Sequence, residues 1–190
     1  MRAFIAIDLG ISVVNNLALL QEDLDEPIDL SLGVVRWTKP ENIHLTLKFL
    51  GDIDESLLFN IRDVLRKIGA EHSIFELETK GSGAFPSLTR PRIVYAGTGN
   101  GLEPLTALRE GIEQGLEELG VARDSRPFQA HTTIGRIKTP RITVDANDFL
   151  SPFTDTCFGT SQVKDLVLCE SQLKRTGPVY RVIERFALGG

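Results

Sequence analysis

The sequence predicts an α+β fold in which mostly antiparallel sheets are combined with a few amphipathic helices. Short apolar runs of β-forming residues follow one another directly in several places, and three other stretches carry apolar residues at helical spacing. The 190 residues are 42% hydrophobic and 25% charged, which is typical of a globular chain with its own core. No linker or low-complexity segment divides the chain, so we predict a single domain over residues 1–190.

Three stretches predict helices. The first, residues 11–24, has an apolar stripe, and we expect residues 25–33 after it to form a loop because a proline and a glycine interrupt them. The second covers residues 55–69, begins after Asp54 as N-cap and ends at a glycine. The third covers residues 102–119 and is followed by another glycine.

Eight segments rich in β-branched and aromatic residues predict strands. They are residues 2–9, 34–38, 42–50, 73–79, 92–98, 129–136, 160–169 and 179–188. Between the fourth and fifth of these segments, the run Gly81–Gly83 predicts a turn, since no helix follows it as in a phosphate-binding loop.

Charge and cysteine content limit the class of protein. A net charge of −5 and a pI of about 5.3 argue against a protein that coats nucleic acid, but they leave room for a local anion site. Cys157 and Cys169 fit no metal or redox spacing, and we expect both to be buried thiols in a reducing cytosol. The apolar runs are too short to span a membrane, and residues 1–9 are too short for a signal peptide. We therefore expect a soluble cytoplasmic protein.

Two of the three histidines stand in the same four-residue frame. These are His44-Leu45-Thr46-Leu47 and His131-Thr132-Thr133-Ile134. With 14 threonines in the chain, such a coincidence has a chance of roughly 1–2%. The repeated frame favours an internal duplication, with two strands facing one another across a pseudo-twofold axis.

Strand periodicity places the polar residues of each frame together. Side chains alternate across a strand, so His44, Thr46 and Lys48 are expected on one face. His131 and Thr133 are expected to share a face in the same way. The opposite face of the first frame is apolar and is expected in the core: Ile43, Leu45, Leu47 and Phe49.

Two imidazoles that face each other can transfer protons at both ends of a displacement at phosphorus. The threonine hydroxyls can donate to non-bridging phosphate oxygens, and Lys48, Arg126 and Arg136 are candidates for holding the anion. Arg126 and Arg136 have the opposite strand parity from His131, so either reaches the site only if the strand bends or ends nearby. No carboxylate cluster accompanies the motifs, and we expect no metal, no cofactor and a bell-shaped pH profile centred near neutrality. The alternative is that each histidine–threonine pair is a plain β-strand feature, and we expect the third histidine to be structural.

Further short motifs run the length of the chain. They are Met1–Asp8, Val35–Trp37, Pro40–Gly51, Gly83–Pro86, Arg90–Arg92, Arg126–Phe128 and Gly177–Tyr180. Together with the two histidine frames, they resemble the 2H phosphoesterases, and within them the RNA 2′,3′-cyclic phosphodiesterase / 2′-5′ RNA ligase family. Ala130 and Thr132 depart from the family pattern, which often has proline and leucine there, and neither departure touches the reacting groups.

The resemblance implies a bilobal duplicated fold of two pseudo-symmetric lobes, with helices outside and one motif from each lobe lining a central cleft. It also implies hydrolysis of an RNA 2′,3′-cyclic phosphate to a 2′-phosphate, with His44 as proton donor and His131 as proton acceptor. Strand geometry alone leaves these two roles interchangeable. RNA with cyclic phosphate ends, tRNA fragments included, is the expected partner of a monomeric chain that binds no membrane. Ligation of tRNA halves through a 2′-5′ bond, and RNA-end binding without turnover, are the alternative functions.

Overall fold

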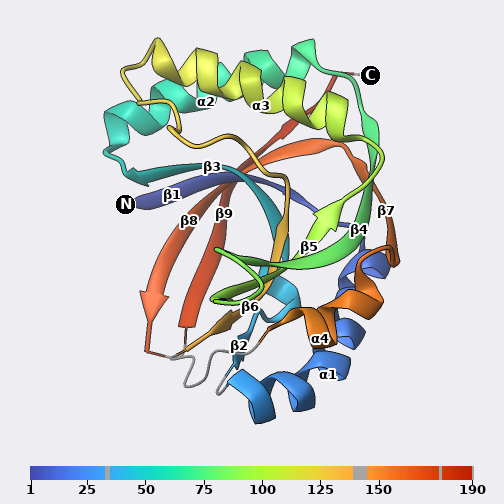
Figure 1. The fold of residues 1–190 in the computed structure, drawn as a ribbon. Coiled ribbons are helices and arrows are strands. Elements are labelled where there is room, and N and C mark those ends of the chain that lie inside the picture. Colours follow the sequence, from blue (N-terminus) through green and yellow to red (C-terminus); the bar gives the residue numbers. More distant parts are fainter. Residues whose placement is uncertain (33–34, 139–144, 176, 190) are drawn as a thin grey trace.

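Strands dominate the fold and pair into one sheet (Figure 1). The computed structural model describes residues 1–32, 35–138, 145–175 and 177–189. Among these residues, nine antiparallel strands form a sheet in the order β7-β4-β5-β6-β3-β1-β8-β9, and β2 pairs with β6. The predicted α+β class and antiparallel pairing are confirmed, whereas the two expected sheets are joined into one. The strands are β1 (Arg2–Asp8), β2 (Val35–Trp37), β3 (His44–Asp52), β4 (Phe75–Phe85), β5 (Ile93–Thr98), β6 (Thr132–Ile137), β7 (Cys157–Val163), β8 (Asp165–Lys174) and β9 (Gly177–Ala187).

The helices are α1 (Ile11–Leu32), α2 (Glu55–Glu71), α3 (Leu102–Glu117) and α4 (Asn147–Leu150). The prediction of a loop after residue 24 is wrong, because α1 continues through Pro27. Ile28 is fully buried and extends the apolar stripe of the helix by one more turn. The free energy gained from this burial offsets the loss of the hydrogen bond that the proline cannot make. The short helix α4 was not predicted.

The two ends of α2 show one prediction confirmed and one corrected. The carboxylate of Asp54 accepts a hydrogen bond from the amide of Leu57 at 2.8 Å, as expected of an N-cap. Gly69 does not end the helix, which runs two residues further. A Cβ at Gly69 would lie 2.6 Å from the carbonyl oxygen of Ala187, so glycine is needed there because β9 passes close to the helix.

Helices cover one face of the sheet in two groups. In Figure 1, α2 and α3 lie at the top, over β1 and β3, while α1 and α4 lie at the lower right beside β6 and β7. The first group packs on a core that contains Ile5, Ile7 and Leu45, and the second packs on a core that contains Val94 and Ile134. The other face of the sheet, which we call the open face, carries Phe4, His44, Tyr95 and Thr133.

Three strand boundaries differ from the prediction. β4 continues through Gly81–Gly83, where a turn was expected, with an irregularity in its pairing to β5 between Thr79 and Ser82. The segment expected as one strand over 160–169 is split at Lys164 into the ends of β7 and β8. β6 begins at Thr132, so His131 lies just before the strand rather than within it.

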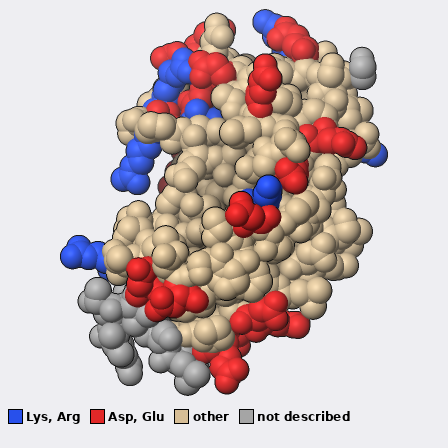
Figure 2. Space-filling view, turned by 45° about the vertical axis from the view of Figure 1, so that its right-hand side comes forward, with Lys and Arg blue, Asp and Glu red and all other residues tan. Residues whose placement is uncertain are grey.

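Figure 2 shows acidic side chains toward the top and the bottom of one face, where Figure 1 places the helices, and a further acidic group beside a basic side chain near the middle. Cys169 is a buried free thiol, as predicted, and burial raises its pKa to about 11, but the free thiol Cys157 is exposed because it begins an outer strand of the sheet. In the described part of the chain, no helix is both long enough and apolar enough to cross a membrane.

Candidate active site

His44 opens β3 and lies half-buried on the open face. Its Nδ1 lies 2.8 Å from the carbonyl oxygen of Asn42, and its Nε2 lies 3.0 Å from Oγ1 of Thr46. Because a carbonyl can only accept, Nδ1 carries a hydrogen and donates it. The neutral ring therefore has its lone pair on Nε2, and the hydroxyl of Thr46 donates to it.

His131 is held in the same way at the start of β6. Its Nδ1 donates to the carbonyl oxygen of Gln129 at 2.7 Å, two residues earlier, as in the first motif. This bond fixes the same tautomer, so Nε2 of neutral His131 is an acceptor. Both imidazoles are thus oriented by their own backbone before any ligand binds.

Each imidazole also lies between a phenylalanine and a tyrosine. His44 stacks on Phe4 at 4.9 Å between ring centroids and meets the edge of Tyr180 at 5.2 Å. The ring of His131 lies edge-on to Phe85 and Tyr95, at 4.9 and 5.6 Å. These aromatic pairs limit rotation of both rings, and their repetition around both histidines matches the repetition of the motif itself.

The two motifs meet at the centre of the sheet. Leu45 of β3 is paired with Thr132 of β6, and both side chains are buried on the helix-covered side. In an antiparallel pair, the residues before and after such partners face the opposite side. His44, Thr46, His131 and Thr133 are therefore brought together on the open face, as strand periodicity predicts.

Burial and charge act in opposite directions on His44. Burial lowers the pKa of His44 below 6.5, and this effect exceeds the raising effects of the Asn42 carbonyl and of the Asp8 carboxylate. Asp8 is the register partner of His44 on β1, and its carboxylate forms a 2.6 Å ion pair with Arg185 of β9. Two features therefore determine the proton affinity of His44: the partial burial of its ring and the nearby Asp8 carboxylate, which is itself paired with Arg185.

Comparisons with known proteins agree with this geometry. The family model described as LigT like Phosphoesterase matches residues 11–95 and 98–180. The chain belongs to the LigT-like phosphoesterase family. Curated relatives include an RNA 2′,3′-cyclic phosphodiesterase of Aquifex aeolicus, 34% identical over 100% of this chain and 98% of the relative. A protein of the same name from Archaeoglobus fulgidus is 32% identical over 98% of this chain and 99% of its own.

Solved structures share the fold of this LigT-like phosphoesterase. The protein TT0787 of Thermus thermophilus is 29% identical and superposes with a TM-score of 0.83 over 100% of this chain and 99% of its own. The structure of E. coli LigT complexed with 3′-AMP has a TM-score of 0.78, with 23% identity over 98% of this chain and 97% of that one.

Lys48 does not lie where strand periodicity places it. The pairing of β3 with β1 shifts by one residue between Thr46 and Lys48, so a β-bulge reverses the alternation there. Lys48 is 2% exposed on the helix side, and its ammonium donates to Glu113 at 2.8 Å, to the Ala122 carbonyl at 2.8 Å and to Asp124 at 3.1 Å. The expectation that Lys48 shares a face with His44 and binds the anion is wrong, because the bulge turns its side chain into the protein.

The bulge on β3 also exposes a residue that was expected in the core. Phe49 is 66% exposed and is paired with Phe4, whose ring lies 6.1 Å from its own. Phe49 therefore lies on the open face beside His44. Sequence periodicity missed it because nothing in the local pattern marks the bulge.

β6 carries a bulge of its own after the second motif. The pairing of β6 with β5 shifts between Thr133 and Gly135, which moves Arg136 to the face of Thr133. Burial raises the pKa of Tyr180 on β9, and the charge of Arg136 opposes that rise. Arg136 therefore meets the condition set for it, namely that the strand departs from regular alternation.

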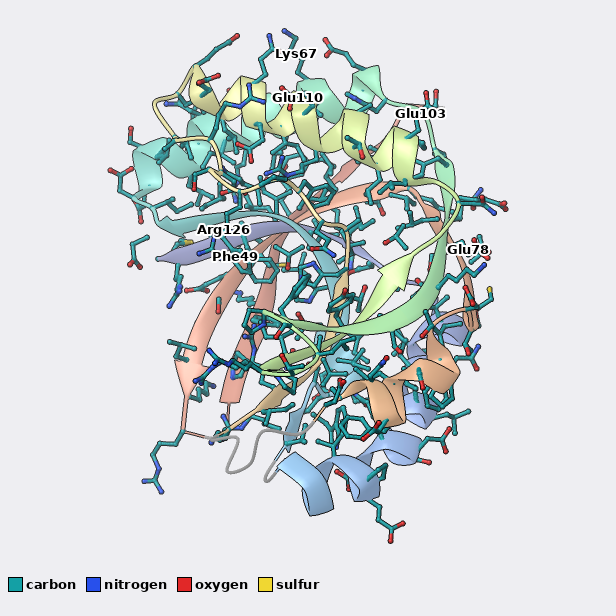
Figure 3. The ribbon with its side chains drawn as sticks, in the orientation of Figure 1. Phe49, Lys67, Glu78, Glu103, Glu110 and Arg126 are labelled. Carbon is teal, nitrogen blue, oxygen red and sulfur yellow. The ribbon has the colours of Figure 1, made fainter. Side chains whose placement is uncertain are left out.

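Arg126 lies in the irregular segment that leads from α3 to His131, and it is exposed. In Figure 3 Arg126 and Phe49 are both labelled on the side of the molecule where β1 and β3 pass beneath the helices. The third histidine, His72, is distant from the motifs and binds the Ile68 carbonyl at the end of α2 at 2.9 Å, which agrees with the structural role expected for it.

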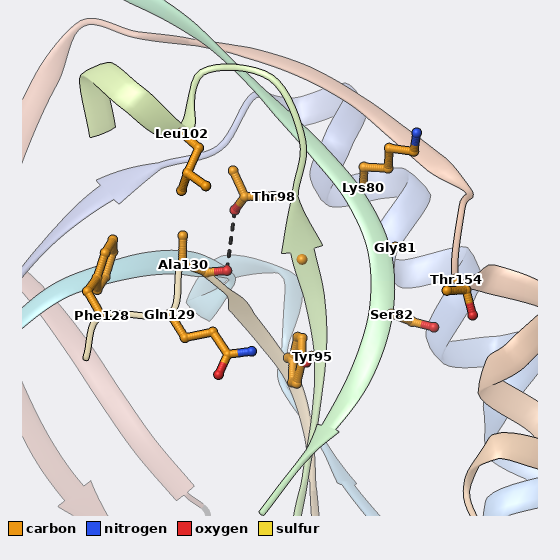
Figure 4. A pocket seen from close by; sticks show the side chains of 11 residues that line it. Lys80, Gly81, Ser82, Tyr95, Thr98, Leu102, Phe128, Gln129, Ala130 and Thr154 are labelled. Carbon is orange, nitrogen blue, oxygen red and sulfur yellow. Dashed lines mark hydrogen bonds between the residues drawn. The ribbon is translucent and has the colours of Figure 1, made fainter. Parts of the chain in front are cut away.

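A cavity of about 380 Å³ adjoins His131 on the side of β4 and β5 (Figure 4). Tyr95 of β5 lines it together with Gln129 and Ala130, the two residues before His131, and Phe128 and Leu102 close one side. Within the described ranges, no group of three or more His, Cys, Asp or Glu side chains is arranged to hold a metal ion.

Proposed function

We propose that the protein hydrolyses RNA 2′,3′-cyclic phosphodiester ends to 2′-phosphomonoesters by metal-independent acid–base catalysis. The observation that carries the proposal is the meeting of the two His-x-Thr motifs on one face beside Leu45 and Thr132. The name of the relatives from A. aeolicus and A. fulgidus supports the substrate class.

In the proposed step, Nε2 of His131 accepts a proton from a water molecule whose oxygen forms a bond to phosphorus. The bond between phosphorus and the 3′ oxygen breaks, and protonated His44 donates its proton to that oxygen. The products are a 2′-phosphomonoester and a free 3′-hydroxyl. The hydroxyls of Thr46 and Thr133 donate to the non-bridging oxygens as their negative charge grows.

Arg136 and Arg126 are the proposed RNA-binding cations. Support for Arg136 comes from the bulge that turns it to the face of Thr133, and support for Arg126 comes from its exposure in the segment before His131. A guanidinium can bind a phosphate through two parallel hydrogen bonds. Lys48 is left out of this set, because its three donors are bound to protein oxygens.

The activity is tested with an oligoribonucleotide that ends in a 2′,3′-cyclic phosphate, incubated with the protein in EDTA. Phosphorus NMR distinguishes the cyclic ester from the 2′- and 3′-phosphates. We expect complete conversion to the 2′-phosphate. Turnover that needs an added divalent metal, or a 3′-phosphate product, would contradict the proposed step, and RNA binding without turnover would make the protein a binding module.

Ligation is a second candidate, because it is the same displacement with a 5′-hydroxyl in place of water as the nucleophile, and the same bond to the 3′ oxygen breaks. In-line attack requires the 5′-hydroxyl to approach phosphorus on the side of His131, which is the proposed general base. The 380 Å³ cavity lined by the two residues before His131 has room for a nucleoside. The test is to add an RNA with a 5′-hydroxyl and to measure 2′-5′-joined product. Absence of product at saturating acceptor would leave hydrolysis alone.

We further propose that the chain consists of two pseudo-symmetric lobes, acts as a monomer in the cytoplasm and accepts tRNA fragments. The repeated histidine tethers and aromatic pairs support the duplication. The free thiols Cys157 and Cys169 suit a reducing compartment. Light scattering tests the oligomeric state, and tRNA halves with cyclic phosphate ends test the substrate.

A further inference from the structure

We propose that Lys48 is a positioning residue that ties the segment before His131 to the strand of His44. The inference rests on the proposed function for its effect on turnover, but its structural part can be tested without RNA. The segment concerned, residues 121–131, connects α3 to β6 without helix or strand, and we call it the 121–131 segment.

The ammonium of Lys48 joins three parts of the chain. Its donors go to Glu113 on α3 and to two oxygens of the 121–131 segment, the Ala122 carbonyl and the Asp124 carboxylate. An ammonium has three hydrogens, so the site uses every donor that Lys48 has. Lys48 stands only four residues after His44, and the segment it holds leads directly to His131.

Arg109 completes the network from the solvent side. Its guanidinium binds Glu113 at 2.6 Å and Asp124 at 3.0 Å, and it lies 4.8 Å from the ring centre of Phe128. In both Glu113 and Asp124, therefore, one carboxylate oxygen binds Lys48 and the other binds Arg109. Burial raises the pKa of Asp124, but Lys48 and Arg109 outweigh that effect and lower the pKa overall, so the carboxylate stays charged.

The position of the 121–131 segment determines the orientation of His131. Its imidazole is held by the carbonyl of Gln129, which directly follows Phe128. The later part of the segment has other contacts as well: Phe128 and Ala130 pack against the core, and Thr98 donates a 3.5 Å hydrogen bond to the Ala130 carbonyl. Release of Ala122 and Asp124 would allow Gln129 to move and His131 to leave its single tautomer.

Stability alone does not account for an ion pair at this depth. Lys48 and Glu113 are 2% and 1% exposed, and the cost of removing two such charges from water cancels much of their attraction. Two apolar side chains of similar volume would fill the space about as well. Apolar side chains could not bind Ala122 or Asp124. The charged pair therefore contributes the hydrogen bonds that hold the 121–131 segment.

The decisive variant is therefore the double substitution Lys48→Met with Glu113→Leu, which replaces the buried pair by apolar side chains. We expect a melting temperature near that of the wild type, faster amide exchange in the 121–131 segment and mixed tautomers of His131 in nitrogen NMR, with the His44 signals unchanged. On a cyclic phosphate substrate, kcat should fall at least about tenfold with little change in KM, because the reacting groups lose their alignment.

Two further variants keep the inference falsifiable if the double variant folds poorly. Asp124→Asn changes a half-exposed side chain, and it should raise exchange in the 121–131 segment and lower kcat in part. Ser161→Ala is the matched control, because it removes a different buried hydrogen bond, the 2.8 Å contact to the amide of Gly10, and should leave His131 unaffected.

Unchanged His131 signals and wild-type kcat in the folded double variant would overturn the inference. So would a loss of activity that only follows the unfolded fraction, since a merely structural role predicts that result. If the wild-type protein proves inactive on cyclic phosphates, the proposed function fails, while the NMR and exchange measurements still decide whether Lys48 positions His131.

Discussion

Phe49 and Arg136 occupy equivalent positions relative to the two His-x-Thr motifs. Each stands three residues after the threonine of a His-x-Thr motif, and in each strand a β-bulge between the threonine and this residue turns it to the open face. The two motif strands share this bulge but differ in the side chain that it turns outward, which is an aromatic ring in β3 and a guanidinium in β6. Such an asymmetry suits a ligand that has a nucleobase at one end and a phosphate at the other.

Phe49→Ala should raise the KM for cyclic phosphate oligonucleotides about tenfold or more, with little change in kcat. A nucleobase stacked on an exposed aromatic ring is stabilised by about 1–3 kcal/mol, and alanine removes that surface. Phe59→Ala is the control, because Phe59 is 64% exposed, close to the 66% of Phe49, but lies on α2. Equal KM values for the wild type and the Phe49 variant would exclude stacking at this position.

Arg136→Gln should weaken binding of a non-hydrolysable RNA about tenfold, because it removes one phosphate contact. The slope of log affinity against log salt should fall by about one, as expected when one cation is lost. Lys67→Gln removes a similar charge from the far side of α2, labelled in Figure 3, and should leave the slope unchanged. An unaltered slope for Arg136→Gln would mean that this guanidinium does not touch RNA.

The sequence was sufficient for the residues whose neighbours are local, and it failed where pairing between distant strands decides the outcome. Alternation correctly placed His44 with Thr46, because both precede the bulge on β3. It failed at Lys48 and Phe49, whose faces depend on how β3 pairs with β1. The apolar stripe of α1 indicated a helix, but Pro27 concealed that burial of Ile28 would carry the helix further.

The aromatic surroundings of the histidines could not be predicted at all from sequence. Tyr180 and Phe4 reach His44 from strands that are far apart in the chain, and only the sheet order brings them together. The same holds for the ion pair of Lys48 with Glu113 on α3. Long-range pairing is also what places His131 beside the first motif, although the repeated motif itself indicated that the two would meet.

The pH dependence should be displaced to the acid side of the neutral optimum expected from two ordinary imidazoles. His44 must be protonated to donate, and burial lowers its pKa from the ordinary value of a histidine, so kcat/KM should fall as the pH rises above this lowered pKa. Asp8→Asn removes a charge that raises this pKa and leaves Arg185 unpaired nearby, and both changes move the falling limb to still lower pH.

Profiles of kcat/KM against pH for the wild type and for Asp8→Asn test whether the falling limb moves to lower pH in the variant. Among the charged and titratable groups on this face, Asp8 acts directly on the pKa of His44 and is paired with Arg185, Tyr180 meets the ring of His44 edge-on, and His131 lies on the same face. Asp52→Asn, at the other end of β3, is the matched control and should leave the limb in place. A limb that moves to higher pH in the Asp8 variant would contradict the assignment of His44 as the acid.

Thr46→Val and Thr133→Val should each lower kcat by roughly 10- to 10³-fold while the fold is retained. Valine keeps the shape and the β-preference of threonine, but it cannot donate to a phosphate oxygen whose charge grows in the transition state. Thr106→Val removes a hydroxyl that donates to a helix carbonyl on α3 and serves as the control. Steady-state kinetics at wild-type rates for both motif variants would show that the two hydroxyls are structural only.

The last prediction concerns the two histidines together. His44→Ala and His131→Ala should each lower kcat by at least about 10²- to 10⁴-fold, because each group transfers a proton in the same transition state. The double variant should be scarcely slower than either single variant, since the effects of groups that act as a unit are not additive.

Melting temperatures of the histidine variants should change little, because both rings lie on the open face and are only half-buried. His72→Ala, which alters a ring bound to the end of α2, should keep wild-type turnover. A folded His44→Ala protein that hydrolyses a cyclic phosphate at the wild-type rate would remove the basis of the two-histidine mechanism, and additive losses in the double variant would separate the two histidines into independent steps.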